Sequence, residues 1–132
     1  MKMLSILAVS VILMPGCAAR LRGHGDAGWE RLGTRTVNFH ADHDTILAGL
    51  QGTFRAIRIE VDRSELEMFD IKVHFGNGEV FDAGTRIHFH EGTWSRVIDL
   101  PRTERIIKRI DFWYKTQHRG EGRAVVTVWG LN

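Results

Sequence analysis

The sequence predicts an all-β domain, an antiparallel β-sandwich of the jelly-roll type, and two observations indicate this fold. Apolar and polar residues alternate over short segments, which is the period of a strand with one buried face. Turn residues separate these segments at intervals of about eight to twelve residues, as in sandwiches and small barrels. The 132-residue chain shows no helical period long enough for βαβ units. We therefore expect roughly seven to nine short strands, with a small barrel as the alternative.

The first seventeen residues, MKMLSILAVSVILMPGC, are typical of an export signal. Lys2 gives a positive start, and the apolar run that follows ends at Met14. Such a run has the length of a signal-peptide core and is too short to span a bilayer as a stable anchor. The end of the segment, with Gly16 directly before Cys17, resembles the signal peptide of bacterial lipoproteins. That resemblance implies that Cys17 is diacylated and becomes the mature N-terminus.

This interpretation has one alternative, and it sets the expected location and the first segment of the mature protein. An ordinary secretory signal, cut after Ala18 or Ala19, is the alternative to a lipoprotein signal, and both predict export. A lipidated Cys17 would bind the protein to a membrane, since two acyl chains anchor where one is marginal. Ala18 is not the Asp that retains lipoproteins at the inner membrane, so we expect the periplasm or the outer membrane. Residues 18–28 are rich in glycine and predict a flexible tether.

The predicted domain spans residues 29–132, and its first half contains two strand regions and, between them, a short strand or turn at residues 45–49. Residues 29–39 form the first region, with a bulge or bend expected at Gly33. Residues 54–62 alternate strictly and form the second region. A short link at residues 63–65 leads from this strand into the next element.

Residues 67–82, EMFDIKVHFGNGEVFD, predict a β-hairpin around a Gly-Asn-Gly turn. A two-residue turn would place Asp82 opposite Val73 and direct a carboxylate toward the core. A three-residue loop with Gly78 at positive φ instead places Phe81 opposite Val73 and Asp82 opposite Lys72. We favour the second register, because it pairs two apolar residues on one face and two opposite charges on the other. A slip of one residue would reverse every face.

The C-terminal part predicts further strands with turns between them. Strands are expected at residues 86–90, 93–100, 110–114 and 124–130. One helical turn is expected at residues 103–108, capped by Thr103, and a polar turn at residues 117–122.

Composition and motifs favour a protein that is not an enzyme and carries no cofactor. The net charge of +2 comes from dispersed cations, whereas nucleic-acid binders cluster them on one face. The single cysteine excludes an intrachain disulfide, and no serine lies in a nucleophile motif. Asp70, Asp82 and Asp99 offer carboxylates for acid–base chemistry, but pairing with Lys72 and nearby arginines is the simpler interpretation.

Histidines are the main candidates for a binding site. His88 and His90 are two residues apart on one predicted strand, so both imidazoles point to the same face and could bind zinc or a similar metal. His74 lies on a polar face and is the expected third ligand. Glu91 directly follows His90 in the sequence. A loop cluster of metal-compatible residues is a separate possibility: His40, Asp42, His43 and Asp44.

Tryptophans offer a second kind of binding surface. Of the four, Trp113 is out of phase with its apolar neighbours and is expected to be accessible, while Trp94 and Trp129 are expected in the core. An accessible tryptophan on a sheet can stack on sugar rings or anchor a protein. The partners considered are therefore an envelope protein or polysaccharide, besides the membrane.

Four segments carry a resemblance to a family: FGNGEVFD, RVIDLP, IKRIDFWYKT and VTVWG. Over residues 29–130 the chain resembles a family of small exported bacterial proteins known only as a domain of unknown function. The resemblance implies a β-sandwich in the cell envelope and supplies no catalytic residues. We expect a non-enzymatic envelope lipoprotein that acts as a binding or structural module. The alternative is a metal- or small-ligand-binding domain that uses the surface histidines.

Overall fold

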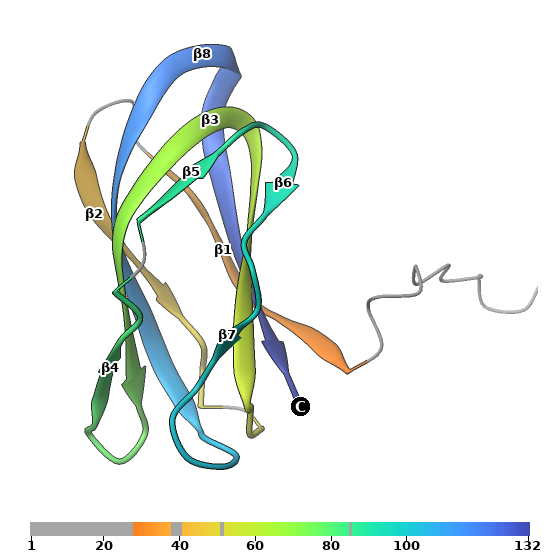
Figure 1. Ribbon diagram of the computed structural model, residues 1–132, viewed down its shortest axis with the longest axis vertical. Coiled ribbons are helices and arrows are strands. Elements are labelled where there is room, and N and C mark those ends of the chain that lie inside the picture. Colours follow the sequence, from red (N-terminus) through yellow and green to blue (C-terminus); the bar gives the residue numbers. More distant parts are fainter. Residues whose placement is uncertain (1–27, 38–40, 51, 85) are drawn as a thin grey trace, which may run out of the picture.

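A computed structural model describes residues 28–37, 41–50, 52–84 and 86–132, except the side chains of residues 117–122. Every regular element in this part of the chain is a strand, so the predicted all-β class is confirmed (Figure 1). The strands are β1 (Trp29–Thr36), β2 (Asp42–Leu47), β3 (Ala56–Phe75), β4 (Val80–Asp82), β5 (Ile87–Phe89), β6 (Thr93–Trp94), β7 (Ile98–Asp99) and β8 (Ile107–Leu131). The described residues contain no helix that could cross a bilayer.

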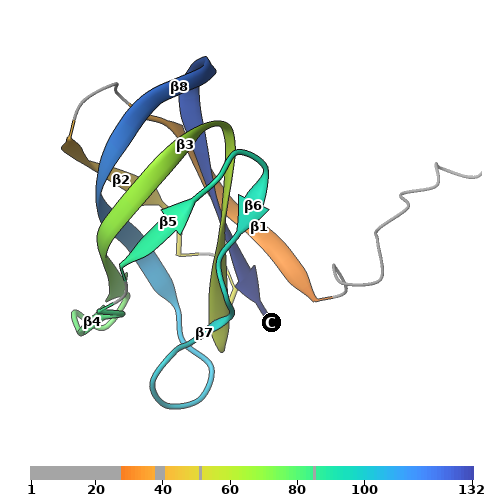
Figure 2. The ribbon, with the colours of Figure 1, turned by 45° about the horizontal axis from the view of Figure 1, so that its top comes forward.

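The two long strands β3 and β8 organise the sheet. They contain 20 and 25 residues, pair with each other along most of their length, and both arch over at the same end of the molecule (Figures 1 and 2). The pairing shifts register on both sides of Ser64, and the preceding Arg63 has a φ of 71°. Such bulges bend a strand without ending its ladder. The bend therefore folds one sheet into two halves that face each other.

This continuity corrects two predicted breaks. The link expected at residues 63–65 and the turn expected at residues 117–122 both lie inside long strands, and Ser64 pairs with Gly120 across them. A polar stretch forms a turn where strand pairing ends. Here the bulge lets the hydrogen-bonded pairing of β3 with β8 continue through the polar stretch.

Shorter strands extend both edges of the long pair. β1 and β2 pair with the C-terminal and N-terminal halves of β8, and β4, β5, β6 and β7 pair along the other edge of β3. All eight strands thus belong to a single sheet that is curled around one core. The small barrel describes this arrangement better than two separate sheets.

Close packing of β1 on β2 explains the bend at Gly33. The β1–β8 register shifts between Arg31 and Gly33. A Cβ at Gly33 would lie only 2.4 Å from the Cγ2 atom of Ile46. The irregularity predicted at Gly33 is therefore confirmed, and the missing side chain lets β1 and β2 approach closely. Both strands pair with β8 but not with each other.

The predicted hairpin register is confirmed. Val73 pairs with Phe81 and Lys72 pairs with Asp82. Gly78 has a φ of +93°, as the three-residue loop requires. One detail differs: a register shift between Met68 and Asp70 turns Met68, rather than Phe69, into the core.

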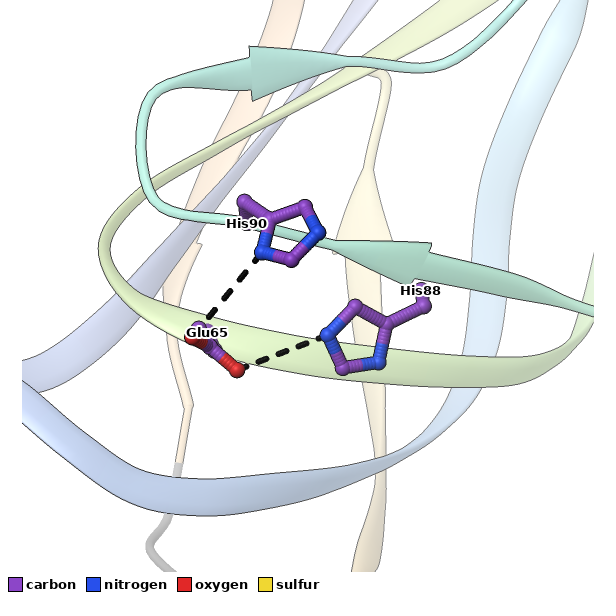
Figure 3. A group of neighbouring side chains, drawn as sticks. All are labelled: Glu65, His88 and His90. Carbon is purple, nitrogen blue, oxygen red and sulfur yellow. Dashed lines mark ion pairs between the residues drawn. The ribbon is translucent and has the colours of Figure 1, made fainter.

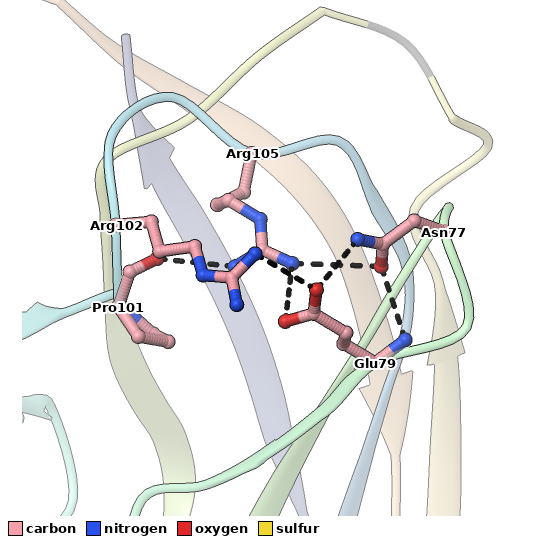
Figure 4. A network of polar contacts seen from close by, with 5 residues as sticks. All are labelled: Asn77, Glu79, Pro101, Arg102 and Arg105. Carbon is pink, nitrogen blue, oxygen red and sulfur yellow. Dashed lines mark hydrogen bonds and ion pairs between the residues drawn. The ribbon is translucent and has the colours of Figure 1, made fainter.

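The prediction of a helical turn at residues 103–108 is wrong. This segment is not helical, and the side chain of the buried Arg105 holds it against neighbouring elements. The Arg105 guanidinium donates to Glu79 Oε2 at 3.2 Å and to the Pro101 carbonyl oxygen at 3.2 Å (Figure 4). It also lies 3.8 Å from the centre of the Phe75 ring. These contacts join the loop before β8 to the β3–β4 hairpin, and an extended backbone lets Arg105 and Phe54 exchange two hydrogen bonds.

Candidate functional site

Pairing of β5 with β3 creates a cluster of metal-compatible side chains on the outside of the sheet. Phe89 lies opposite Leu66, and both point into the core. Alternation then directs the flanking His88 and His90 outward, and it directs Glu65 to the same face. The prediction that the two histidines share a face is confirmed by their ring centres, which are 4.9 Å apart.

The three side chains converge on one point (Figure 3). His88 Nε2 lies 3.4 Å from Glu65 Oε2, and His90 Nδ1 lies 3.9 Å from Glu65 Oε1. One ligand atom from each residue can be chosen so that all lie within 4.8 Å of one another. The side chains of Glu65, His88 and His90 are 31%, 42% and 72% exposed, so solvent and ions reach the cluster.

This donor set is chemically suited to a first-row transition metal. Zinc binds histidine nitrogen and carboxylate oxygen at about 2.0–2.2 Å, which brings tetrahedral ligand atoms to roughly 3.3–3.5 Å of one another. The Glu65–His88 contact is already in that range, and a small side-chain rotation of exposed His90 would complete the set. Three protein ligands leave a fourth position for water or another ligand. The nearby Glu67 is engaged by Arg86, whose Nε lies 3.1 Å from its carboxylate.

Sequence reasoning missed Glu65 as the third residue of this cluster. The residue lay in a predicted link, where alternation has no meaning, whereas it actually belongs to the continuous strand β3. Glu91, which was considered as the neighbouring acid, is not in the group. The signal that identifies Glu65 is the β3–β5 register, which only the fold supplies.

His74 lies in a different cluster, centred on Asp111. His74 Nε2 is 2.8 Å from Asp111 Oδ2, and Arg109 Nε is 3.5 Å from the same oxygen. The hydroxyl of Thr45 donates to Asp111 Oδ1 at 2.6 Å, and His43 Nε2 lies 3.6 Å from that oxygen. Burial raises the pKa of Asp111, but the Thr45 hydrogen bond and the neighbouring His74, Arg109 and His43 lower it more, so its pKa is below the ordinary value.

The loop cluster predicted around His43 does not form one site among the described residues, and His40 lies outside them. His43 joins the Asp111 cluster on the outer face. Asp44 instead accepts hydrogen bonds from Arg35 Nε at 3.1 Å and from the Tyr114 hydroxyl at 2.9 Å. Consecutive residues of a strand point to opposite faces, and β2 therefore separates these side chains.

All three tryptophans with a predicted position differ from the prediction. Trp113 is half-buried: the His43 ring stacks on it at 4.5 Å, and the Lys72 ammonium lies 5.3 Å from its ring centre. Trp94, which was expected in the core, is 41% exposed. It pairs with Glu60, which is half-buried on the outer face of β3. Trp129, which was also expected in the core, is half-buried on the same side of the sheet.

Two of the three carboxylates considered for acid–base chemistry do come together. Burial and a hydrogen bond with Asp82 raise the pKa of Asp70, and the same bond lowers the pKa of Asp82. The charge of Lys72 favours the ionised form of both carboxyl groups. Asp99 lies on β7 and pairs with Ala56, away from this hairpin.

The fold and these clusters define a small all-β module with polar side-chain clusters on its outer face. Residues 5–130 match the family described as a domain of unknown function, DUF2541, and the chain belongs to this family. No curated protein and no solved structure matches the chain.

Proposed function

We propose that this protein is a non-enzymatic, exported envelope module that is lipid-anchored at Cys17 and binds a divalent transition metal at Glu65, His88 and His90. One observation carries the binding part: two imidazoles and a carboxylate from neighbouring strands place ligand atoms within 4.8 Å of one another. The N-terminal signal pattern and the placement of Cys17 support export and anchoring.

The chemistry of the donors favours zinc or copper. Imidazole nitrogen is a good ligand for Zn²⁺ and Cu²⁺, whereas Mg²⁺ and Ca²⁺ prefer sets made of oxygen. Because all three side chains are partly exposed and the fourth position is open, the bound metal would exchange with solution. Such a site suits capture or presentation of a metal at the envelope better than permanent structural support.

Metal-dependent stability tests the binding site. Thermal unfolding is measured with and without Zn²⁺ or Cu²⁺ in the wild type, in His88→Ala, in His90→Ala and in Glu65→Gln. A ligand at about 100 times its Kd stabilises the folded state by about 2.7 kcal/mol, and the melting temperature should rise accordingly. Each of the three substitutions should remove most of that rise.

The matched control is His43→Ala, which removes a partly exposed histidine that also faces a carboxylate. Its metal-induced rise should equal that of the wild type. A rise that survives in both His88→Ala and His90→Ala, or no rise with either metal, would contradict the proposed site.

The anchor is tested separately by intact mass and membrane fractionation beside Cys17→Ser. A membrane-bound species with lipid mass on Cys17, lost in the variant, is the expected result. A water-soluble species that begins after Ala18 or Ala19 would exclude the anchor and leave the metal site untouched.

A further inference from the structure

Three of the four tryptophans gather around one arginine on the outer face of β1, β8, β3 and β6. The registers explain the grouping: Trp129 lies between Arg31 and Arg58, and Trp94 lies opposite Glu60. These strands run side by side in the half of the sheet that carries the C-terminus (Figures 1 and 2). This surface is called the tryptophan platform below and consists of Trp29, Arg58, Glu60, Trp94 and Trp129.

Specific contacts hold the rings of the platform in place. The Arg58 guanidinium carbon lies 4.3 Å from the centre of the Trp29 ring and 4.2 Å from that of Trp94. The rings of Trp94 and Trp129 are 5.9 Å apart and tilted by 43°. Trp129 Nε1 donates to Glu60 Oε1 at 3.4 Å. Cation–π contacts of this kind fix the rings before a ligand arrives, which lowers the entropic cost of binding.

Trp94 is the exposed ring of the platform, with Arg58 against one of its faces, and Trp29 and Trp129 are half-buried. Trp94 is 41% exposed, but Trp113 has His43 stacked on it and Lys72 above its ring. The surroundings of the platform are polar: Arg31 and Thr34 are exposed on β1, and Glu60 presents its carboxylate beside Trp94. Rigid aromatic faces next to hydrogen-bonding groups suit a ligand with both apolar C–H faces and hydroxyl groups.

We infer that the tryptophan platform binds a polysaccharide built of pyranose rings. The C–H face of a pyranose would stack on Trp94, and the Glu60 carboxylate would accept hydrogen bonds from ring hydroxyls. Exposed Arg31 adds a positive charge that favours acidic sugars. Protein interfaces have an apolar core, which disfavours a protein partner at the platform. The exposed aliphatic residues of the described chain lie mostly elsewhere: Leu47, Leu50, Val80 and Ile106, with Val97 alone near this edge.

Titration calorimetry with two soluble probes tests the inference, which is independent of the metal site and of the anchor. The probes are chitohexaose and a galacturonic acid hexamer, and they separate neutral from acidic sugars. Binding of either probe should weaken at least tenfold in Trp94→Ala and stay within about threefold in Trp94→Phe, which keeps an aromatic face. Glu60→Gln should weaken binding several-fold. The double variant His88→Ala/His90→Ala should bind as the wild type does.

A second measurement keeps the inference testable if Trp94→Ala does not fold. Indole N–H resonances of the wild type are followed during titration, and those of Trp94 and Trp129 should shift while that of Trp113 stays in place. Failure of both probes to bind at millimolar concentration would overturn the inference. So would unchanged binding in folded Trp94→Ala, or a shift confined to Trp113.

Discussion

Two clusters in this protein contain a carboxylate and two histidines, yet their surroundings are opposite. Glu65 faces His88 and His90 in an exposed group whose ligand atoms converge. Asp111 faces His43 and His74, but its side chain is only 11% exposed. Residue composition alone therefore does not distinguish a metal site from a structural network.

The position of each carboxylate in the sheet explains the difference. Asp111 lies on β8, with Thr45 of β2 opposite it on one side and Lys72 of β3 on the other. The Thr45 hydroxyl, the two histidines and the Arg109 guanidinium surround its carboxylate. Glu65 lies at the bend of β3, where the adjacent β5 is a short strand of three residues. The described contacts of its carboxylate are those with His88 and His90, whose side chains are themselves exposed.

The largest effect expected from this comparison concerns stability. Asp111→Asn should lower the free energy of unfolding by about 2 kcal/mol, because it removes the charge that His74 and Arg109 face in a mostly buried position. Urea unfolding at pH 7 measures the change. A loss below about 0.5 kcal/mol would mean that the Asp111 network is as dispensable as a surface ion pair.

The second effect is the pH dependence of that network. The folded-state pKa of Asp111 lies below its ordinary value of 3.8, so the ionised form is favoured by folding. Its contribution is therefore present above about pH 4 and is lost as pH falls through the lowered pKa. The stability difference between wild type and Asp111→Asn should shrink from pH 5 to pH 2 in thermal unfolding. A constant difference over this range would contradict the assignment.

The parts of the fold that sequence predicts are those set by local chemistry. The Gly-Asn-Gly loop determines one hairpin register, and both the Val73–Phe81 pair and the positive φ of Gly78 are confirmed. Alternation also places His88 and His90 on one face. Each of these depends on residues close together in the chain, where geometry leaves few options.

The parts that sequence does not predict depend on long-range pairing. A bulge at Arg63 carries β3 through an expected link, and this brings Glu65 beside the histidines. Another shift next to Phe69 reverses the expected face there. Trp94 was expected in the core as part of one continuous strand at residues 93–100, but the structure has two separate short strands there. Local alternation cannot detect such interruptions.

The smallest effect is the one that distinguishes the exposed cluster most sharply. Without metal, Glu65→Gln should change the free energy of unfolding by no more than about 0.5 kcal/mol, because an exposed carboxylate–histidine contact contributes little in water. The same substitution should nevertheless abolish most of the stabilisation by zinc. Chemical unfolding with chelator and with Zn²⁺ gives both values for one variant. A large loss in chelator would place Glu65 in the same structural role as Asp111, and His88 and His90 would then be its partners rather than ligands of a metal.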